Sequence, residues 1–362
     1  MKRRRFLKSA GVVLSTAAVA MPAIAKSQPS LKWRLTSSFP KSLGTLYGGA
    51  EFLAKQVAEM TDGNFTIQCF AAGEIVPGLQ ALDAAGNGTV EIAHTAPYYY
   101  VGKDPSFAFG SAIPFGLNAR QQNAWLIHGG GGDLLNDLFK KYGVIGFPVG
   151  NTGTQMGGWF RNEIKTIDDL KGLKMRIAGI AGNVMGKLGV IPQQLAGGDI
   201  YPALEKGTID AAEWVGPYDD EKLGFVRVAP YYYYPGWWEG GTILQGMINL
   251  NKWNELPKQY QAVLKNAMQN ANVWVQGRYD ALNPAALRRL VAAGAKLRPF
   301  STEIMNAALK SANELYAEIS AKNKTFERLL KNANAFRADE YLWWQVGEYS
   351  YDSFMIRHRD GR

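Results

Sequence analysis

Apolar positions in the first third of the chain follow two periods, one typical of strands and one typical of helices. Apolar and polar residues alternate over Leu31–Ser38, Phe65–Ala71 and Val90–Ala96, which predicts three strands. Helical spacing over Leu46–Met60 and a shorter stretch over Pro77–Ala85 predict helices between them. Because strands and helices alternate, we expect an α/β architecture in which most strands pair in parallel.

The same alternation continues through the middle of the chain. Residues Asn123–Tyr142 have a helical pattern, but Gly129–Gly132 interrupts it, and we expect Asp133 to cap the helix that follows. The glycine run lacks the Gly-Lys-Ser/Thr ending of a phosphate-binding loop. A buried strand is predicted over Val144–Val149. A second unit then follows, with strands at Gln155–Arg161, Lys174–Ala178, Ile191–Leu195 and Ile209–Trp214 and helices at Asn183–Leu188 and Pro202–Lys206.

The last third of the chain is predicted to be mostly helical. Apolar residues recur at helical spacing over Tyr260–Val275 and Ile304–Ile319. The segment Asp339–Ile356 carries aromatic residues on more than one helical face, which is more apolar surface than one subunit usually covers. This segment predicts either a dimer in which the C-terminal helix packs on its partner, or docking of that helix within one subunit.

The first 25 residues have the plan of an export signal. Met1–Lys8 is basic, Gly11–Ala20 is a short apolar run, and Ala23–Ala25 has the small residues of a cleavage site. The apolar run is shorter than the roughly 20 residues that a membrane-spanning helix needs. We therefore expect a cleaved signal peptide and a mature protein in the periplasm. The adjacent arginines favour the twin-arginine route, although the same residues can serve general secretion.

Composition and charge exclude several classes of function. The formal net charge is +9, but part of it lies in the expected signal, so the mature chain is only mildly basic and we expect no nucleic-acid partner. Cys69 is the only cysteine and lies in a strand pattern, which predicts a buried, unreactive thiol. The three histidines, His94, His128 and His358, are scattered, so no cysteine–histidine zinc cluster is expected.

Rare polar residues stand in apolar, glycine-rich surroundings in the middle of the chain. Arg176 lies inside a predicted strand, where its guanidinium would either bind a carboxylate in a cleft or form an ordinary surface ion pair. Gln155 lies in a loop after a buried strand, where open α/β sheets bind ligands. Glu213, Glu239 and the Gln155 amide oxygen would make an all-oxygen site for a hard cation. The two carboxyls alone would instead suit an acid/base pair.

Two aromatic segments accompany these polar residues. Tyr98–Tyr100 follows a predicted strand, and Pro230–Gly241 is rich in tyrosine and tryptophan. Both segments are typical of aromatic pocket walls, although bulk packing uses the same residues. Because Thr95 and Tyr100 stand at a strand end, we expect both to contact a ligand.

Two further segments are specific enough to indicate a family. Asp169–Arg176 and Tyr201–Ala211, together with Ser37–Pro40 and Ala72–Glu74, resemble the solute-binding subunits of tripartite ATP-independent periplasmic (TRAP) transporters. The resemblance covers essentially the whole mature chain. Within the family, the chain is most similar to the binders of 2-oxo monocarboxylates. The segments that carry this closer resemblance are Tyr98–Tyr100, Gln155–Phe160, Glu213–Asp220 and Tyr231–Glu239.

The resemblance implies an α/β fold of two domains, a periplasmic binding protein of the type II clamp architecture with long C-terminal helices. It implies that Arg176 holds the carboxylate of a 2-oxo acid such as pyruvate. It also implies that Gln155, Glu213, Trp214 and Glu239 surround a bound cation and the substrate, with Trp214 acting through its backbone carbonyl. Sodium is the expected ion, calcium is the alternative, and no catalytic cofactor is expected.

The clamp architecture also implies a division of the chain and a set of partners. The expected partners are a small carboxylate ligand, integral-membrane TRAP transporter subunits and a second copy of the chain, held through the C-terminal helix. The expected parts are the signal peptide over 1–25, domain I over 26–152 and 241–280, domain II over 153–240 and 281–320, and a C-terminal dimerisation region over 321–362.

Two alternative functions stay open from the residues alone. The first alternative is a binder of lactate, another hydroxy acid or a C4 dicarboxylate, since Arg176 would hold any carboxylate. The second is a secreted hydrolase that uses Glu213 and Glu239 as acid and base. A turnover assay distinguishes the second alternative, because a binding protein, which is what we expect, breaks no bond.

Overall fold

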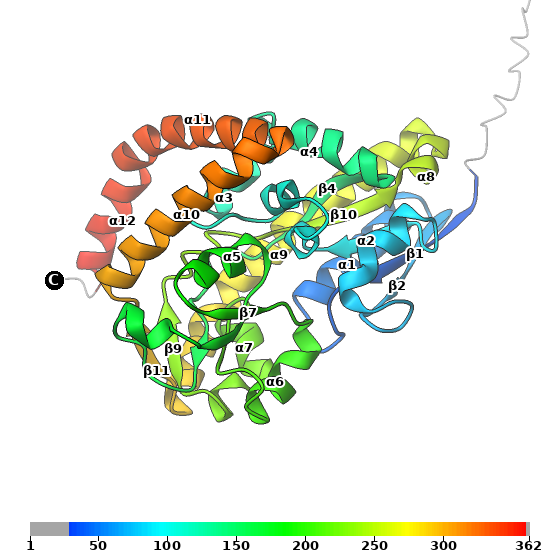
Figure 1. Cartoon of the computed structure of the whole chain (residues 1–362). Coiled ribbons are helices and arrows are strands. Elements are labelled where there is room, and N and C mark those ends of the chain that lie inside the picture. The colour runs from blue at the N-terminus through cyan, green and yellow to red at the C-terminus, as the bar shows by residue number, and fades with distance from the viewer. Residues whose placement is uncertain (1–28, 360–362) are drawn as a thin grey trace, which may run out of the picture.

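The protein is built around two β-sheets, which Figure 1 shows with helices on their faces. The structure is a computed structural model that describes residues 29–359. The expected signal peptide over 1–25 therefore lies outside the described residues. Within them, no helix is long and apolar enough to cross a membrane.

The first sheet has five strands in the order β2-β1-β3-β10-β4. Strand β1 pairs in parallel with β2 and β3, whereas β10 is antiparallel to both β3 and β4. The helices that cover this sheet form the first lobe with it. The strand bounds are β1 Leu31–Ser37, β2 Phe65–Phe70, β3 Ile92–Thr95, β4 Val144–Asn151 and β10 Ile243–Asn249.

The second sheet has six short strands in the order β11-β9-β5-β8-β6-β7 and forms the second lobe with its helices. Strand β6 is parallel to β7 and β8, and β5 is antiparallel to β8 and β9. The strand bounds are β5 Trp159–Phe160, β6 Lys174–Arg176, β7 Ile191–Gln193, β8 Ala211–Ala212, β9 Tyr231–Tyr234 and β11 Lys296–Pro299.

Pairing in both sheets is mixed: five of the nine strand pairs are parallel and four are antiparallel, so the expected parallel pairing holds only for a narrow majority. The chain crosses from the first sheet to the second between β4 and β5, and it returns between β9 and β10. Strands β5 and β10 are the first strands entered after these two crossings, and both run antiparallel to their neighbours. A third crossing leads from β10 to β11, which pairs in parallel with β9. Apolar periodicity identifies a strand but carries no information about its direction, so the pattern could not predict this.

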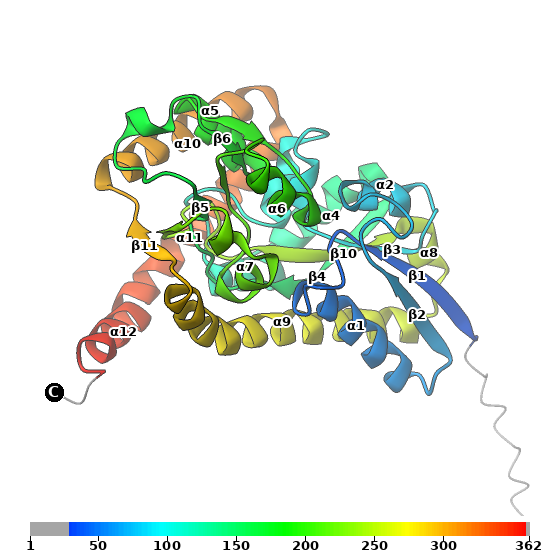
Figure 2. The same ribbon diagram turned by 90° about the horizontal axis from the view of Figure 1, so that it is seen from below.

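Helices surround both sheets, and the longest one joins the two lobes. Helix α9 contacts α1 and β4 in the first lobe and α7 in the second, and Figure 2 shows it running beneath both. The helix bounds are α1 Leu46–Met60, α2 Ala81–Gly86, α3 Ala119–Ile127, α4 Gly131–Phe139, α5 Gly179–Lys187, α6 Gly197–Glu205, α7 Pro217–Leu223, α8 Leu250–Glu255, α9 Lys258–Ala292, α10 Thr302–Lys322, α11 Lys324–Val346 and α12 Glu348–Arg357.

Two local expectations are corrected by the structure. Asp133 does not cap α4, because the helix begins earlier, at Gly131, with Gly130 as its N-cap in the left-handed region that glycine adopts easily. Asp133 lies instead in the first turn, where a carboxylate still favours the positive end of the helix. Cys69 is only partly buried, which corrects its expected full burial; burial raises the pKa of its thiol to about 12, which favours the neutral thiol, and its lack of reactivity stays a prediction.

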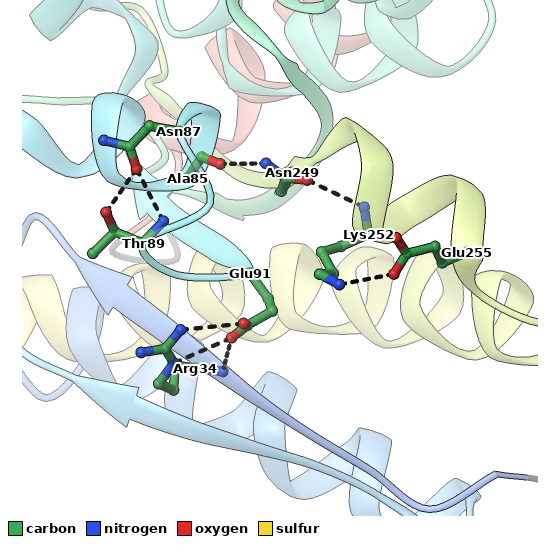
Figure 3. Close-up of polar contacts among 8 residues, drawn as sticks. All are labelled: Arg34, Ala85, Asn87, Thr89, Glu91, Asn249, Lys252 and Glu255. Carbon is green, nitrogen blue, oxygen red and sulfur yellow. Dashed lines mark hydrogen bonds and ion pairs between the residues drawn. The ribbon is translucent and has the colours of Figure 1, made fainter.

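The rim of the first lobe is held by polar contacts between elements that are distant in sequence (Figure 3). Glu91 accepts hydrogen bonds from the backbone nitrogen of Arg34 at 2.7 Å and from its guanidinium. Asn249 caps α8 by accepting from the Lys252 nitrogen at 3.1 Å, and its side-chain nitrogen donates to the Ala85 carbonyl at 2.8 Å. The Glu91 bonds tie β1 to the residue before β3, and the Asn249 bonds tie the end of β10 to α2 and α8.

The C-terminal helices pack across both lobes and then project away from them. Helix α10 contacts α5 of the second lobe, and α11 contacts α4 of the first. Helix α12 extends beyond the body of the molecule in Figures 1 and 2. The large apolar side chains that α11 and α12 leave exposed are Tyr341, Leu342, Trp343, Val346, Tyr349, Tyr351, Phe354, Met355 and Ile356.

Candidate functional site

A buried hydrogen-bond network ties together the β4–β5 and β9–β10 connections, both of which cross between the two sheets. Gln155 Nε2 donates to the hydroxyls of Thr152 and Thr242 at 3.0 Å each, and the Thr242 nitrogen donates to Thr152 Oγ1 at 3.1 Å. The Thr242 hydroxyl donates to Glu239 Oε2. Gln155 and Glu239 are thereby held at the junction of the two lobes. Among the described residues only the nitrogen end of the Gln155 amide has hydrogen-bond partners, which leaves its oxygen available to a ligand.

Arg176 and Glu213 meet at the ends of two neighbouring parallel strands. Strand β6 pairs with β8 so that Arg176 stands opposite Ala212, which brings Glu213 directly beside the guanidinium. Arg176 Nη1 donates to Glu213 Oε1 and, at 2.9 Å, to the Glu213 carbonyl. The Ala178 nitrogen donates to the same carboxylate oxygen at 2.9 Å. Arg176 is 1% exposed and Glu213 is 0% exposed, so this pair is not a surface ion pair.

Each member of this pair, and Gln155 as well, has a buried polar atom with no hydrogen-bond partner among the described residues. These atoms are Arg176 Nη2, Glu213 Oε2 and Gln155 Oε1. A buried polar atom without a partner costs roughly 1–3 kcal/mol, so such atoms indicate that these residues bind a ligand or an ion. The guanidinium nitrogen suits a carboxylate, and the two oxygens suit a hard cation.

The electrostatics of the two glutamates agree with a cation site. Burial, followed by repulsion from the Glu213 carboxylate, raises the pKa of Glu239 to about 8. Burial also raises the pKa of Glu213, against the pull of Arg176 and the Ala178 nitrogen. Two nearby buried carboxylates cannot both ionise cheaply without a positive charge between them. A cation would supply that charge.

No cluster of three or more histidine, cysteine, aspartate or glutamate side chains that could hold a metal is found in residues 29–359. A cation bound here would therefore rely on only two carboxylates, with amide and backbone oxygens completing its shell. Such a shell suits sodium or calcium and does not suit a transition metal, which prefers nitrogen or sulfur ligands.

Aromatic side chains enclose the site. The Trp214 ring lies 4.9 Å from the Arg176 guanidinium carbon and also contacts Phe39 of the first lobe. Tyr98 is buried, and its hydroxyl lies in the field of Glu239 and Glu213. Its ring packs so closely on Gly179 that a Cβ there would lie 2.9 Å from it, at a backbone φ of +64°. The site is thus closed off from bulk water by contacts between the lobes.

The structure places Thr95 and Tyr100 in a separate hydrogen-bond network inside the first lobe. The Ser38 hydroxyl donates to Thr95 Oγ1 at 2.6 Å, and Thr95 pairs with the Tyr100 hydroxyl at 2.8 Å. That hydroxyl also accepts from the Leu82 nitrogen at 3.1 Å. Both side chains are occupied by neighbours, and their ligand contacts stay a prediction.

Reasoning from the sequence missed Thr242 and Gln194. Thr242 links Glu239 to Gln155, and its only signal was a polar residue three positions after the glutamate. Gln194 contacts both lobes, as described below. The acid/base alternative is not favoured by the geometry, because Glu213 Oε1 is fixed by Arg176 and the Ala178 nitrogen.

Comparison with known proteins agrees with this architecture. Residues 36–323 match the family of bacterial extracellular solute-binding proteins, family 7. The chain is 52% identical over 360 residues to a monocarboxylate 2-oxoacid-binding periplasmic protein from Nostoc sp. (strain PCC 7120), a match that covers 98% of this chain and 99% of that protein.

Two solved structures share the fold. A TRAP transporter solute binding protein from Bordetella bronchiseptica RB50, with copurified calcium and picolinate, has a TM-score of 0.90 at 50% identity, covering 91% of this chain and 98% of its own. One from Pseudoalteromonas atlantica T6c, with bound sodium and pyruvate, has a TM-score of 0.87 at 39% identity, covering 90% and 99%. The chain therefore belongs to family 7 of the bacterial extracellular solute-binding proteins, the DctP family, and is a solute-binding protein of the TRAP type.

Proposed function

We propose that this protein binds a small 2-oxo monocarboxylate such as pyruvate together with a cation, and delivers it to the membrane subunits of a TRAP transporter. The observation that carries the proposal is that one guanidinium nitrogen of Arg176, one carboxylate oxygen of Glu213 and the amide oxygen of Gln155 are buried without a hydrogen-bond partner among the described residues. The name of the Nostoc relative and the pyruvate and sodium of the Pseudoalteromonas structure support the same ligand class.

The chemistry of a 2-oxo acid matches these groups. Its carboxylate and adjacent keto oxygen can chelate one cation, while Arg176 takes the remaining carboxylate charge. Gln155, Glu213, Glu239 and the backbone carbonyl of Trp214 would hold the cation, which is sodium or calcium. Inside a closed cleft of low dielectric these charges attract more strongly than in water. Thr95 and Tyr100 are proposed as further ligand contacts.

Closure of the two lobes over the ligand is part of the proposal. Domain I would span 26–152 and 241–280, and domain II 153–240 and 281–320, so that the crossing segments act as hinges. Ligand contacts from both sides exist only in the closed state, so ligand binding shifts the population toward closure. Gln155 and Glu239 lie on the crossing segments themselves, which couples the cation to the hinge.

We further propose a homodimer held through residues 321–362, and a cleaved signal peptide over 1–25. The exposed apolar side chains on α11 and α12 support the dimer, because monomers rarely expose so large an apolar face. The Bordetella structure is described as a mixed occupancy dimer. Truncation after Ala338 should give monomers in light scattering, and intact dimers would contradict this interface.

The proposed ligand class is tested by calorimetry, which measures binding of each candidate acid to protein that has been dialysed against a chelator. Pyruvate, lactate, succinate and picolinate would each be titrated with sodium, with calcium and with neither. We expect pyruvate to bind tightly only when a cation is present, and to be consumed in no reaction. Binding of succinate but not pyruvate, or turnover of any of these compounds, would overturn the proposal.

A further inference from the structure

The side chain of Gln194 joins the two lobes with the two ends of a single amide. Gln194 follows β7 in the second lobe, and its Nε2 donates to the carbonyl of Tyr99 at 2.9 Å. Tyr99 lies on the short helix η2, Pro97–Tyr100, which follows β3 in the first lobe. The oxygen of the same amide accepts from the nitrogen of Gly179, at 3.3 Å, at the start of α5. This amide therefore bridges a first-lobe carbonyl and a second-lobe helix.

Gln194 also stands between two openings that lie between the lobes. The larger opening, about 450 Å³, is lined from the first lobe by residues near Ser38 and Gly78 and from the second by Gly197 and its neighbours. The smaller opening, about 320 Å³, lies between Tyr99 and Gly182. Gln194 lines both openings.

The segment at Gln194 is also connected directly to Arg176. The carbonyl of Leu195, the next residue, accepts from Arg176 Nε at 3.2 Å. The Tyr99 hydroxyl also lies in the electrostatic field of the Arg176 guanidinium. A movement that pulls Gln194 away from Tyr99 would therefore disturb the support of Arg176 at the same time.

We propose that Gln194 is the latch that holds the lobes closed and sets the residence time of the ligand. The latch is a positioning residue, because it acts on the lobes and on Arg176, and no contact with the ligand is required of it. The inference concerning residence time rests on the proposed function, whereas the inference concerning closure does not. Loss of one neutral hydrogen bond between the lobes should speed opening about three- to tenfold.

Gln194→Glu is the variant that isolates the latch. A carboxylate keeps an acceptor for the Gly179 nitrogen but has no proton to donate to the Tyr99 carbonyl, and the two oxygens repel. Gln269→Glu is the control, because it makes the same change at an exposed position on α9, where the side-chain amide has no hydrogen bond among the described contacts. Gln194→Met serves as a second variant of similar length that removes both bonds.

Stopped-flow tryptophan fluorescence with pyruvate and sodium gives the first readout, since Trp214 lies at the site. We expect the dissociation rate to rise about three- to tenfold in Gln194→Glu and Gln194→Met, with the association rate nearly unchanged. Equal dissociation rates in Gln194→Glu and Gln269→Glu would overturn the role in residence time. A fall in association rate alone would also overturn it.

A distance measurement without ligand gives the second readout and keeps the two proposals separable. Spin labels would be placed on Lys32→Cys and Lys206→Cys, exposed positions in different lobes, with Cys69 replaced by serine. Gln194→Glu should shift the distance distribution away from that of the wild type, and Gln269→Glu should leave it unchanged. If Gln194→Glu gives the same distance distribution as the wild type, Gln194 does not hold the lobes closed, and this conclusion does not depend on the ligand. If the latch variants shift and the wild type ignores pyruvate, the proposed ligand is wrong and the latch stands.

Discussion

Two arginine–glutamate pairs, one at the rim of the first lobe and one between the lobes, show how burial decides what an ion pair does. At the rim, Arg34 is 48% exposed and Glu91 15%, and both carboxylate oxygens of Glu91 accept from Arg34 (Figure 3). Between the lobes, Arg176 and Glu213 are almost fully buried, yet each keeps one polar atom without a partner.

The two pairs therefore have different physical roles. An exposed pair contributes about 0–1 kcal/mol to stability, because water screens the charges and the side chains lose entropy. A buried pair carries a desolvation cost that its own attraction only partly offsets, so stability alone does not explain it. The unpartnered atoms at Arg176 and Glu213 do explain it, because a ligand and a cation would complete their hydrogen bonds and charges.

The sharpest test of this contrast is Arg176→Ala. Removal of the guanidinium takes away the carboxylate partner of the ligand, and a charged hydrogen bond is worth roughly 1.5–3 kcal/mol, so pyruvate affinity should fall by about 10- to 100-fold. Breaking a buried ion pair from one side also costs about 3–5 kcal/mol of stability. Calorimetry and urea unfolding measure the two effects. Near-normal affinity in a folded variant would remove Arg176 from the site.

Glu239→Gln probes the cation in the same buried region. Loss of one of two carboxylates weakens an all-oxygen site, so the affinity for calcium should fall by roughly tenfold and pyruvate binding should depend less on sodium. The control is Glu221→Gln, which removes a carboxylate paired with Arg289 at the surface. An unchanged ion response in Glu239→Gln, or an equal loss in the control, would show that Glu239 holds no cation.

Much of the fold, and the family, could be predicted from the sequence, because both rest on local patterns. Helical spacing predicted Leu46–Met60, and α1 has these bounds. The expected α/β fold with long C-terminal helices is confirmed by the structures that superpose on it. The expected family is confirmed as well. These features depend on the periodicity of side chains or on contiguous motifs, and both can be read directly from the sequence.

The missing parts depend on contacts between segments that are distant in sequence. Nothing local indicates that Thr242 donates to Glu239 and accepts from Gln155, or that Gln194 reaches Tyr99. The placement of Tyr100 against Thr95 likewise depends on how a short helix folds back on β3. The domain boundaries and the ligand contacts stay predictions. Apolar patterns specify which face of an element is buried, but they do not specify which partner meets it.

Asp220 is a buried carboxyl whose contribution to stability should depend on pH. Asp220 accepts hydrogen bonds from Trp159 Nε1 at 2.9 Å and from the Tyr232 hydroxyl at 2.7 Å, yet burial raises its pKa from 3.8 to about 7. The folded protein therefore keeps a proton that the unfolded chain releases. Its stabilising effect is fully present below pH 3.8 and is lost as the pH rises through about 7.

This predicts that the Asp220 contribution to the free energy of unfolding falls between pH 4 and pH 7, with a limiting slope of roughly 1.4 kcal/mol per pH unit. Asp220→Asn should remove that part of the slope, since the amide oxygen can still accept while the group no longer titrates. Urea unfolding at a series of pH values measures the slope. Asp352→Asn, at an exposed position, is the control. Identical slopes in the wild type and Asp220→Asn would contradict the effect of burial.

The smallest effect on stability is expected for the exposed Arg34–Glu91 pair at the rim of the first lobe. Arg34→Ala should lower the free energy of unfolding by less than about 1 kcal/mol, and added salt should shrink the difference further, because the pair is exposed and screened. Pyruvate affinity should not change, since the rim shares no contact with the groups between the lobes. Urea unfolding at low and high salt, with calorimetry on the same samples, measures both quantities. If Arg34→Ala lowered affinity as much as Arg176→Ala, burial and unpartnered atoms would no longer distinguish the binding pair from the rim pair.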